Sequence, residues 1–213
     1  MFKLSSILFD VELSHLQLQG GGYMPRQPRR IAVGYPHHVT QRGNNREPVF
    51  LDNSDYLKYL SLLTEYSEKY ELDIWSYCLM PNHVHFLVVP HTVEGLSRGI
   101  GTTNMLYTQY FNKRYQRSGR IWQNRFFSCI VSNNDYLWNV TRYIENNPVK
   151  SGLAECAWEY EWTSAKAHCY GETDEILNGP GWLQDEMKQV YREYLNGTDR
   201  LIEEQIRVAT STG

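Results

Sequence analysis

The chain has 213 residues, of which 41% are apolar and 14% aromatic, values typical of one compact domain of ordinary size. Its four cysteines form no CxxC pair and no disulfide framework, which favours a reducing, cytoplasmic location. No apolar stretch approaches the ~18 residues that a membrane span needs, and Asp10 and Glu12 interrupt any signal-peptide pattern near the start. We therefore expect no membrane partner.

The net charge of −3 hides a segregation of charge along the chain. Residues 24–46 contain five arginines and no acid, and residues 95–134 contain six basic residues and no acid. From residue 155 to the end, twelve acidic residues stand against five basic ones. This asymmetry favours contact between one face and a polyanion, although ordinary solvated charge would produce the same counts.

The first predicted elements follow an extension that ends in three glycines. Residues 1–23 are expected to be flexible, and the folded unit is expected to start at Met24. The segment IAVGYPHHVTQRG predicts a strand of about ten residues that ends near Gly43, and leucines at helical spacing predict a helix over 54–70. Two strands at 73–80 and 83–89 are joined by so short a turn that we expect antiparallel pairing.

A second half with the same alternation of elements follows. A helical pattern covers 93–115, with glycines that weaken its first turns, and a strand (125–131) and a helix (135–147) that Pro148 ends come next. This order predicts an α+β fold, an antiparallel sheet with helices on one face, over residues 24–154. Residues 155–213 are expected to form an acidic, mostly helical appendage, with an amphipathic helix through Leu183 and Tyr194 that Gly197 closes.

The stretch MPNHVHFLVVP places two histidines on a predicted strand. His83 and His85 point to the same face, ~7 Å apart along the chain. Two imidazoles so placed can converge on one metal ion, although histidines on a half-exposed strand that face water would give the same letters. A metal site needs a third ligand and a group for the metal to act on.

The predicted helix before Pro148 offers both groups. Tyr143 and Asn147 are four residues apart, so on a helix they share a face, with ~6 Å between their β-carbons. The phenol is a potential nucleophile, and the amide oxygen is a potential ligand. Pro148 disfavours helical geometry at Asn147, and a packed tyrosine followed by an Asn-Pro helix stop is the alternative interpretation.

These segments together resemble a known family. MPNHVHFLVVP resembles the HUH motif, and RYIENNPVKSGL resembles the catalytic helix of the single-tyrosine HUH transposases. YPHHVTQRGNNREPVF and YFNKRYQRSGRIWQNRFFS are also similar to that family, so the likeness extends over about residues 24–170. The closest resemblance is to the bacterial REP-associated tyrosine transposases. It implies the HUH endonuclease fold, a ferredoxin-like or RRM-like antiparallel sheet.

The resemblance also implies roles for individual residues. The metal-binding histidines fall on His83 and His85, the nucleophile on Tyr143, and the polar residue that completes the metal site, Gln in some relatives, on Asn147. The implied cofactor is Mg²⁺ or Mn²⁺. Attack by the tyrosine would give a 5′-phosphotyrosine and a free 3′-OH, so that single-stranded DNA is cleaved and rejoined near a hairpin. Among the other tyrosines, Tyr107 and Tyr110 compete on chemistry alone.

The basic stretches are predicted to bind DNA. Arginine side chains contact phosphates and an indole ring stacks on bases, a combination that suits single-stranded or hairpin DNA. The residues expected to do this are Arg42, Arg46, Arg117, Arg120, Trp122, Arg125 and Lys150. Trp122 as a core residue under a loop is the alternative. His38 resembles a recurrent family position, and a packing role is as compatible with the sequence as a functional one.

Two other functions remain open from the sequence. A rolling-circle replication initiator or relaxase shares the HUH pair, but the single Tyr143 and the lack of a helicase-like extension disfavour it. A regulator that binds DNA hairpins, including repetitive palindromic elements, without cleaving them would not need all four site residues, which are present. Relatives usually continue past TSTG, so a truncated carboxyl terminus is one interpretation. The sequence does not choose between a monomer and a homodimer.

Overall fold

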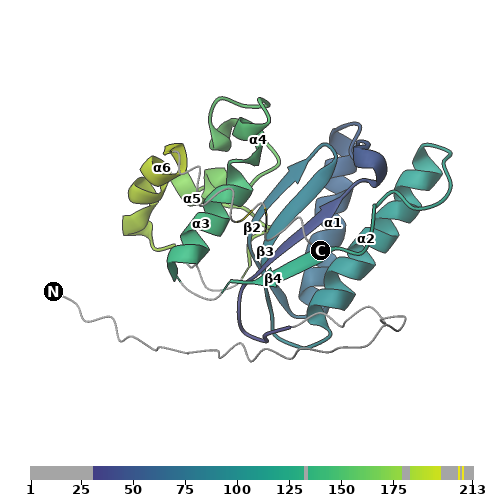
Figure 1. The fold of residues 1–213 in the computed structure, drawn as a ribbon, viewed down its shortest axis with the longest axis horizontal. Helices are drawn as coiled ribbons and strands as arrows, with labels where there is room; N and C mark the ends of the chain where they lie inside the picture. The colour runs from purple at the N-terminus through teal and green to yellow at the C-terminus, as the bar shows by residue number, and fades with distance from the viewer. Residues whose placement is uncertain (1–30, 132–133, 179–182, 198–205, 207, 209–213) are drawn as a thin grey trace, which may run out of the picture.

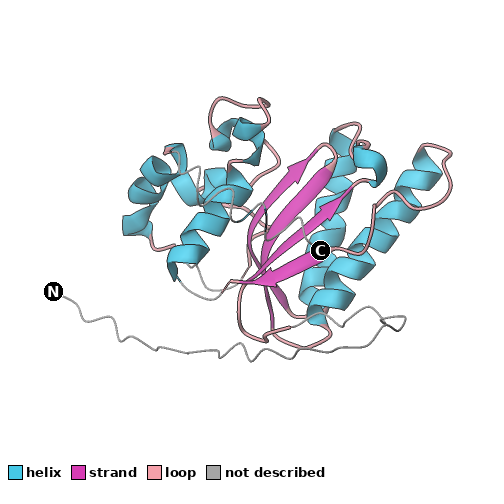
Figure 2. Cartoon of the chain, in the orientation of Figure 1, coloured by secondary structure: helices cyan, strands magenta, loops and turns pink. Residues whose placement is uncertain are grey.

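The structure is a computed structural model that describes residues 31–131, 134–178, 183–197, 206 and 208 (Figures 1 and 2). The expected extension over residues 1–23 and the expected start at Met24 lie outside the described residues. Six elements in the order strand, helix, strand, strand, helix, strand form a sheet and the layer of two helices that packs on it. They are β1 (His37–Arg42), α1 (Asn53–Lys69), β2 (Leu72–Met80), β3 (His83–Pro90), α2 (Gly95–Arg114) and β4 (Phe127–Ile130).

The four strands form one antiparallel sheet in the order β2-β3-β1-β4. With this element order, the sheet has the ferredoxin-like topology, so the predicted α+β fold is confirmed. β1 has six residues, fewer than the ten or so expected. It begins late because Gly34 has a φ of 79° in a turn, and Pro36 follows before the strand starts.

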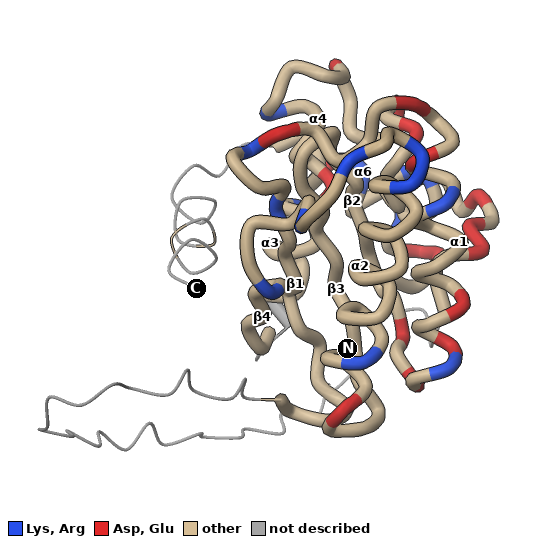
Figure 3. Tube along the Cα trace, turned by 90° about the vertical axis from the view of Figure 1, so that its right-hand side faces the viewer, with Lys and Arg blue, Asp and Glu red and all other residues tan. Residues whose placement is uncertain are grey.

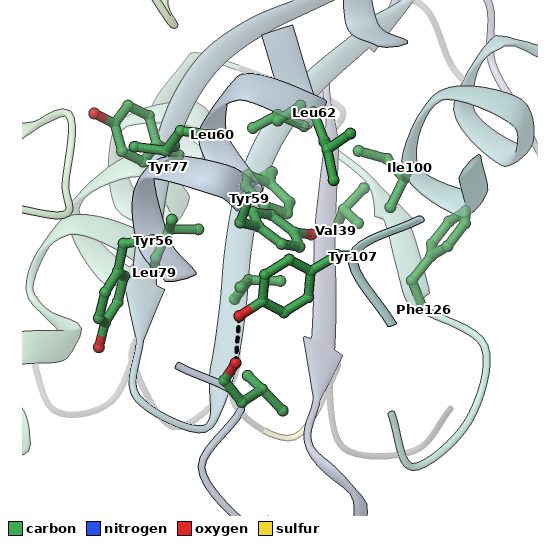
Figure 4. Packing of buried hydrophobic residues seen from close by; sticks show 14 of the residues in the cluster. Val39, Tyr56, Tyr59, Leu60, Leu62, Tyr77, Leu79, Ile100, Tyr107 and Phe126 are labelled. Carbon is green, nitrogen blue, oxygen red and sulfur yellow. Dashed lines mark hydrogen bonds between the residues drawn. The ribbon is translucent and has the colours of Figure 1, made fainter. Parts of the chain in front are cut away.

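Helices α1 and α2 cover one face of the sheet, as Figure 1 shows. The strand side chains on that face include Val39, Val84 and Phe86, all 0% exposed, and they form the main core with both helices. Tyr59 of α1 and Tyr107 of α2 lie at its centre (Figure 4). The period-2 pattern of the strands therefore turns alternate residues into this core and leaves His38, His83 and His85 on the other face.

Helix α3 (Asn134–Glu145) lies against that other face. Its Val140 and Ile144 pack on Met80 and Leu87 of the sheet in a second cluster. The helix ends at Glu145 instead of reaching residue 147, because Asn146 has φ −86° and ψ 1°. A short helix α4 (Asn147–Lys150) starts directly afterwards.

Pro148 does not stop α3 but lies in the first turn of α4. A proline is tolerated there because the backbone N–H that it lacks would have no helical partner.

The described part of residues 155–213 consists of short helices. They are η2 (Ala157–Glu159), α5 (Ala165–Tyr170), η3 (Asp185–Met187) and α6 (Lys188–Asn196). The amphipathic helix expected around Leu183–Tyr194 is α6 preceded by η3, and Gly197 is its C-cap as expected. Within the described residues, no helix is long and apolar enough to cross a membrane.

Candidate active site

The pairing of β1 with β3 brings three histidines together on the face that α3 covers. In the register, Thr40 lies opposite His85 and Arg42 opposite His83, so His38 is a diagonal neighbour of His85. His38 Nε2 lies 3.1 Å from His85 Nδ1, and the two rings stack with centroids 5.3 Å apart. The His83 and His85 rings meet edge to face at 5.0 Å.

Tyr143 of α3 joins this group from the opposite side. Its ring centroid lies 5.7 Å from that of His85 and 5.8 Å from that of His38, both in edge-to-face geometry. The Nζ atom of Lys150 lies 4.5 Å from the centre of the tyrosine ring. Tyr143 is therefore positioned by a helix, and the histidines are positioned by the sheet beneath it.

The break at Asn146 does not separate Asn147 from the site. Asn147 Nδ2 donates to the carbonyl oxygens of Tyr143, at 2.8 Å, and Ile144, at 3.2 Å. Both donor positions of the amide are thereby used for the helix, which leaves Oδ1 for other partners. The Asn147 side chain also interacts with His83, and this interaction acts to raise the pKa of that imidazole. The structure thus brings together the four residues that the sequence singled out.

Burial keeps the three imidazoles neutral at pH 7. Desolvation lowers the pKa of His38 to about 3 and that of His83 to about 4, where Arg42 adds to the effect and the interaction with Asn147 opposes it. The pKa of His85 is held well below its ordinary value by burial and then by cationic neighbours, including Arg42 and Lys150. The site combines neutral imidazole nitrogens with surrounding positive charge, which suits an anionic substrate.

The ring nitrogens that remain available can be assigned from these contacts. His83 Nδ1 lies 2.6 Å from Asn82 Oδ1, and His85 Nδ1 is engaged by His38. These contacts leave three atoms available, the Nε2 atoms of His83 and His85 and the Oδ1 atom of Asn147. Two nitrogens and one oxygen form a ligand set that fits a divalent cation. No group of three His, Cys, Asp or Glu side chains within the described ranges is arranged to hold a metal, so a site here needs Asn147.

The comparison with protein families decides which family the chain belongs to. A family model described as "Transposase IS200 like" matches residues 33–147, which include all four site residues. The protein belongs to the IS200-like transposase family. The chain is therefore a transposase of the single-tyrosine type, which confirms the resemblance seen in the sequence, and transposases of this type are in general metal-dependent.

One curated protein and one solved structure are similar to this IS200-like transposase. It is 29% identical over 135 residues to a Haemophilus influenzae protein named as a REP-associated tyrosine transposase, a match over 56% of this chain and 76% of the relative. The fold is similar to a REP-associated tyrosine transposase solved in complex with a REP hairpin. That match has a TM-score of 0.55 and 17% identity, and it covers 76% of this chain and 96% of the other.

The loop before β4 runs beside the end of β1 and joins two basic segments. The backbone N–H of Gln123 donates to the carbonyl oxygen of Arg42 at 2.9 Å, and Gly43 forms an isolated bridge with Trp122. This places one group of exposed cationic side chains at the end of the sheet where β3 begins with His83. The group, called the basic end below, comprises Arg42, Arg46, Arg120 and Arg125.

Other basic residues at this end of this transposase are partly neutralised. Arg117 forms an ion pair with Glu47 at 3.1 Å, and Arg114 forms one with buried Asp55 at 2.9 Å. The segment that lacks acids in the sequence therefore meets acids from residues 47–55 in space. Figure 3 shows acidic positions along α1, and Lys and Arg positions that gather towards the upper end of the view.

The prediction that Trp122 stacks on DNA bases is wrong for this conformation. The side chain is 6% exposed and packs between Tyr59 and Tyr107, and its Nε1 donates to the carbonyl oxygen of Asn104 at 3.2 Å. Apolar burial of a large indole ring outweighs an exposed position, so the alternative interpretation as a core residue is confirmed.

The competing tyrosines lie on the wrong side of the sheet. Tyr107 is fully buried, and its hydroxyl donates to the carbonyl oxygen of Val49 at 2.5 Å, the dashed line in Figure 4. Burial raises its pKa far above the ordinary value. The hydroxyl of Tyr110 accepts a hydrogen bond from Arg114 at 2.7 Å. Neither ring contacts the histidines.

His38 is the site residue that the sequence left open. The available signal was the alternation in HHVTQR, which puts His38, Thr40 and Arg42 on one face of β1. The pairing of β1 with β3 cannot be read from that segment alone, and this pairing brings His38 to His85.

Proposed function

We propose that this transposase cleaves and rejoins single-stranded DNA beside a hairpin, with Tyr143 as the nucleophile and residues 24–154 as the catalytic domain. The observation that carries the proposal is the position of Tyr143. Its ring lies 5.7 Å from that of His85, and Asn147, just after the end of its helix, donates its amide to the Tyr143 carbonyl oxygen and lies beside His83. The alternatives Tyr107 and Tyr110 have no such neighbours among the described residues.

Neutral His83 and His85 and the Asn147 side chain would hold the metal ion through Nε2, Nε2 and Oδ1. His38 would fix the ring of His85, because the partner of the second ring nitrogen sets the tautomer of a ligating histidine. An ion with this mixed donor set and open positions is Mg²⁺ or Mn²⁺. When bound, it would polarise the scissile phosphate and stabilise the charge that develops there.

The chain's own residues do the rest. A phenol has a pKa of ~10, so ionisation of a tyrosine hydroxyl at pH 7 costs roughly 4 kcal/mol. Lys150, with Nζ 4.5 Å from the ring centre of Tyr143, supplies positive charge beside the developing phenolate. The tyrosine oxygen forms a bond to the phosphorus, and the bond to the 3′ oxygen of the neighbouring nucleotide breaks and leaves a free 3′-OH. A second 3′-OH can reverse the reaction and join strands.

Hairpin DNA as the substrate is supported by two observations. The related transposase of known structure is bound to a REP hairpin, and the basic end offers exposed arginines beside His83. Arg42, Arg46, Arg120 and Arg125 would contact phosphates, with Lys150 beside the scissile bond. Arg117 would have to exchange its ion pair with Glu47, which is exposed and therefore weak. Because the proposed substrate is DNA, we propose that the protein acts in the cytoplasm.

The test uses labelled single-stranded DNA hairpins from the sequence that flanks the gene, with Mg²⁺ or Mn²⁺, on a denaturing protein gel. We expect a slowly migrating adduct that requires the metal and disappears with Tyr143→Phe. Tight, salt-sensitive binding without an adduct would favour a regulator that does not cleave. An adduct that survives Tyr143→Phe would contradict the choice of nucleophile.

A further inference from the structure

The carboxylate of Glu145 is fully buried, and no step of the proposed reaction uses it. Glu145 is the last residue of α3, two residues after Tyr143 and two before Asn147. A carboxylate has about four acceptor positions, and here four polar groups lie within hydrogen-bond distance, three at Oε1 and one at Oε2. The donors are Ser76 Oγ at 3.3 Å, Ser164 Oγ at 2.5 Å, His168 Nδ1 at 2.6 Å and the Tyr191 hydroxyl at 2.8 Å.

These donors come from separate parts of the molecule. Ser76 belongs to β2, His168 to α5 and Tyr191 to α6. Glu145 therefore connects the end of α3 to the sheet and to helices α5 and α6. A buried carboxylate that loses a partner is strongly unfavourable, so these contacts define where the end of α3 lies.

A second row of contacts joins α3 to α6. Asn139, Arg142 and Asn146 follow the spacing i, i+3, i+7 and thus share one side of the helix. Each has a hydrogen-bond partner in α6 or its cap. The Tyr194 hydroxyl donates to Asn139 Oδ1, Arg142 donates to the carbonyl oxygen of Gly197, and Asn146 Nδ2 donates to that of Leu195 at 2.7 Å.

The helix is interrupted between the two active-site residues that it carries. Asn146 departs from helical geometry, so the position of Asn147 relative to Tyr143 is not set by a continuous helix. Glu145 and Asn146, the residues at this interruption, are held by α5 and α6. A shift of about 1 Å in a catalytic group can reduce a rate about a hundredfold, so this restraint bears on the reaction.

We infer that Glu145 is a positioning residue, which joins α5 and α6 to α3 and thereby keeps Tyr143 and Asn147 aligned with the histidines of the sheet. The inference rests on the proposed role of Tyr143. It gives the segment after residue 155 a function other than DNA contact. That segment is acidic, and an acidic surface repels a nucleic acid.

The test removes one hydroxyl group. Tyr191→Phe deletes a donor to Glu145 and retains the ring that packs against Trp138. Tyr59→Phe is the matched control, because its equally buried hydroxyl also donates at 2.8 Å, but to Asn104 in the core on the other face. We expect Tyr191→Phe to slow single-turnover adduct formation at least about tenfold. The Kd for the hairpin should stay within about twofold of the wild-type value. Tyr59→Phe should leave both within about twofold.

A second variant and a second readout keep the inference open to contradiction. Asn146→Ala, which removes the contact with Leu195, should also slow the reaction without weakening DNA binding. Wild-type rates of adduct formation in both Tyr191→Phe and Asn146→Ala would overturn the inference. So would equal losses of rate in Tyr191→Phe and Tyr59→Phe. Hydrogen exchange of the amides of residues 139–147 should be faster in Tyr191→Phe than in Tyr59→Phe. If the wild type forms no adduct, the proposed function fails, and equal hydrogen exchange in Tyr191→Phe and Tyr59→Phe would then reject the positioning role of Glu145 as well.

Discussion

The three histidines beneath α3 differ in what their ring nitrogens contact. His83 and His85 each have Nδ1 engaged, by Asn82 and His38 respectively, which leaves Nε2 available. His38 is 0% exposed and its Nε2 is used on His85. It therefore acts on a ligand of the proposed metal site and is not itself a ligand. This distinction leads to a measurement of metal affinity that needs no DNA.

Replacement of His38 by Phe should weaken metal binding. His38→Phe keeps a ring stacked on His85 but removes the nitrogen that fixes its tautomer, and loss of such a partner typically costs about 10–100-fold in affinity. Mn²⁺ titration of the folded protein measures the change. His37→Phe is the control, because His37 is equally buried but bonds the carbonyl oxygen of Tyr35 away from the site. Equal Mn²⁺ affinity in both variants would contradict a role for His38.

The lowered pKa of His38 also predicts a pH dependence of stability without metal. The unfolded chain binds a proton near pH 6.5 and the folded chain only near pH 3, so between these values the unfolded state binds more protons. Stability is therefore full above pH 6.5 and falls as the pH falls towards 3. From pH 7 to 5, His38 alone should reduce the free energy of unfolding by about 2 kcal/mol. Urea unfolding at pH 7 and pH 5 measures the free energy of unfolding. Its decrease between the two pH values should be smaller by this amount in His38→Phe than in the wild type.

Single residues could be assigned from the sequence when their motif was local. His83 with His85, and Tyr143 with Asn147, lie in short segments whose period places each pair on one face. Trp122 could not be assigned, because an indole beside arginines is compatible with both a stacking surface and a core position. Its burial depends on the contacts of its loop with α1 and α2, which are distant in the sequence.

At the scale of elements, two of the three glycines early in α2 show that a role set by distant contacts cannot be read from the local sequence. Their sequence predicts only a weakened first turn. In the structure, Gly95 and Gly99 are places of close approach, since a Cβ at Gly95 would lie 2.8 Å from the carbonyl oxygen of Tyr70 and one at Gly99 would overlap Leu72 Cδ1. The helix begins at Gly95 because packing on α1 and β2 outweighs the low propensity of glycine.

Two alanine substitutions in α2 should therefore have opposite effects. Gly99→Ala forces Leu72 to move in a buried contact and should destabilise the fold by about 1–3 kcal/mol. Gly101→Ala meets no heavy atom within 4 Å and should stabilise the fold by about 0.5–1 kcal/mol, because alanine has the higher helix propensity. Urea denaturation measures both. A change of the same sign in the two variants would contradict the packing of α2 against β2.

The order of elements was predictable because each strand and helix has a clear period, whereas their ends were not. α3 was expected to run to residue 147 and ends at Glu145, since the buried contacts of Glu145 and the turn at Asn146 hold it there. The contacts that decide this boundary come from β2, α5 and α6. No local pattern in residues 135–150 contains that information.

At the scale of the whole molecule, charge is arranged by folding and not only by sequence. The acid-free segment from residue 95 to 134 loses part of its positive charge to Asp52, Asp55 and Glu47. The basic end, with Arg42, Arg46, Arg120 and Arg125, retains its charge beside His83, with no ion pair to any described residue. The positive charge with which a polyanion is expected to make contact is therefore concentrated at one end of the sheet.

The basic end should govern the salt dependence of hairpin binding. Replacing Arg120 and Arg125 by Gln removes two phosphate contacts, so the slope of log K against log salt should become shallower by roughly 1.5. Fluorescence anisotropy at several salt concentrations measures the slope. The matched control is Lys69→Gln with Arg98→Gln, which removes the same charge from exposed positions near the ends of α1 and α2 that are remote from His83.

The two pairs separate a local contact from the effect of net charge. If DNA is held at the basic end, the control pair leaves the slope unchanged. Salt at 0.1 M screens charges more than ~10 Å apart, and Lys69 and Arg98 lie towards the opposite end of the sheet, where Leu72 pairs with Pro90. Equal slopes in the two variants would mean that general charge attracts the DNA and that the loop before β4 makes no specific phosphate contact. Cleavage by Tyr143 would then need another surface to present the hairpin.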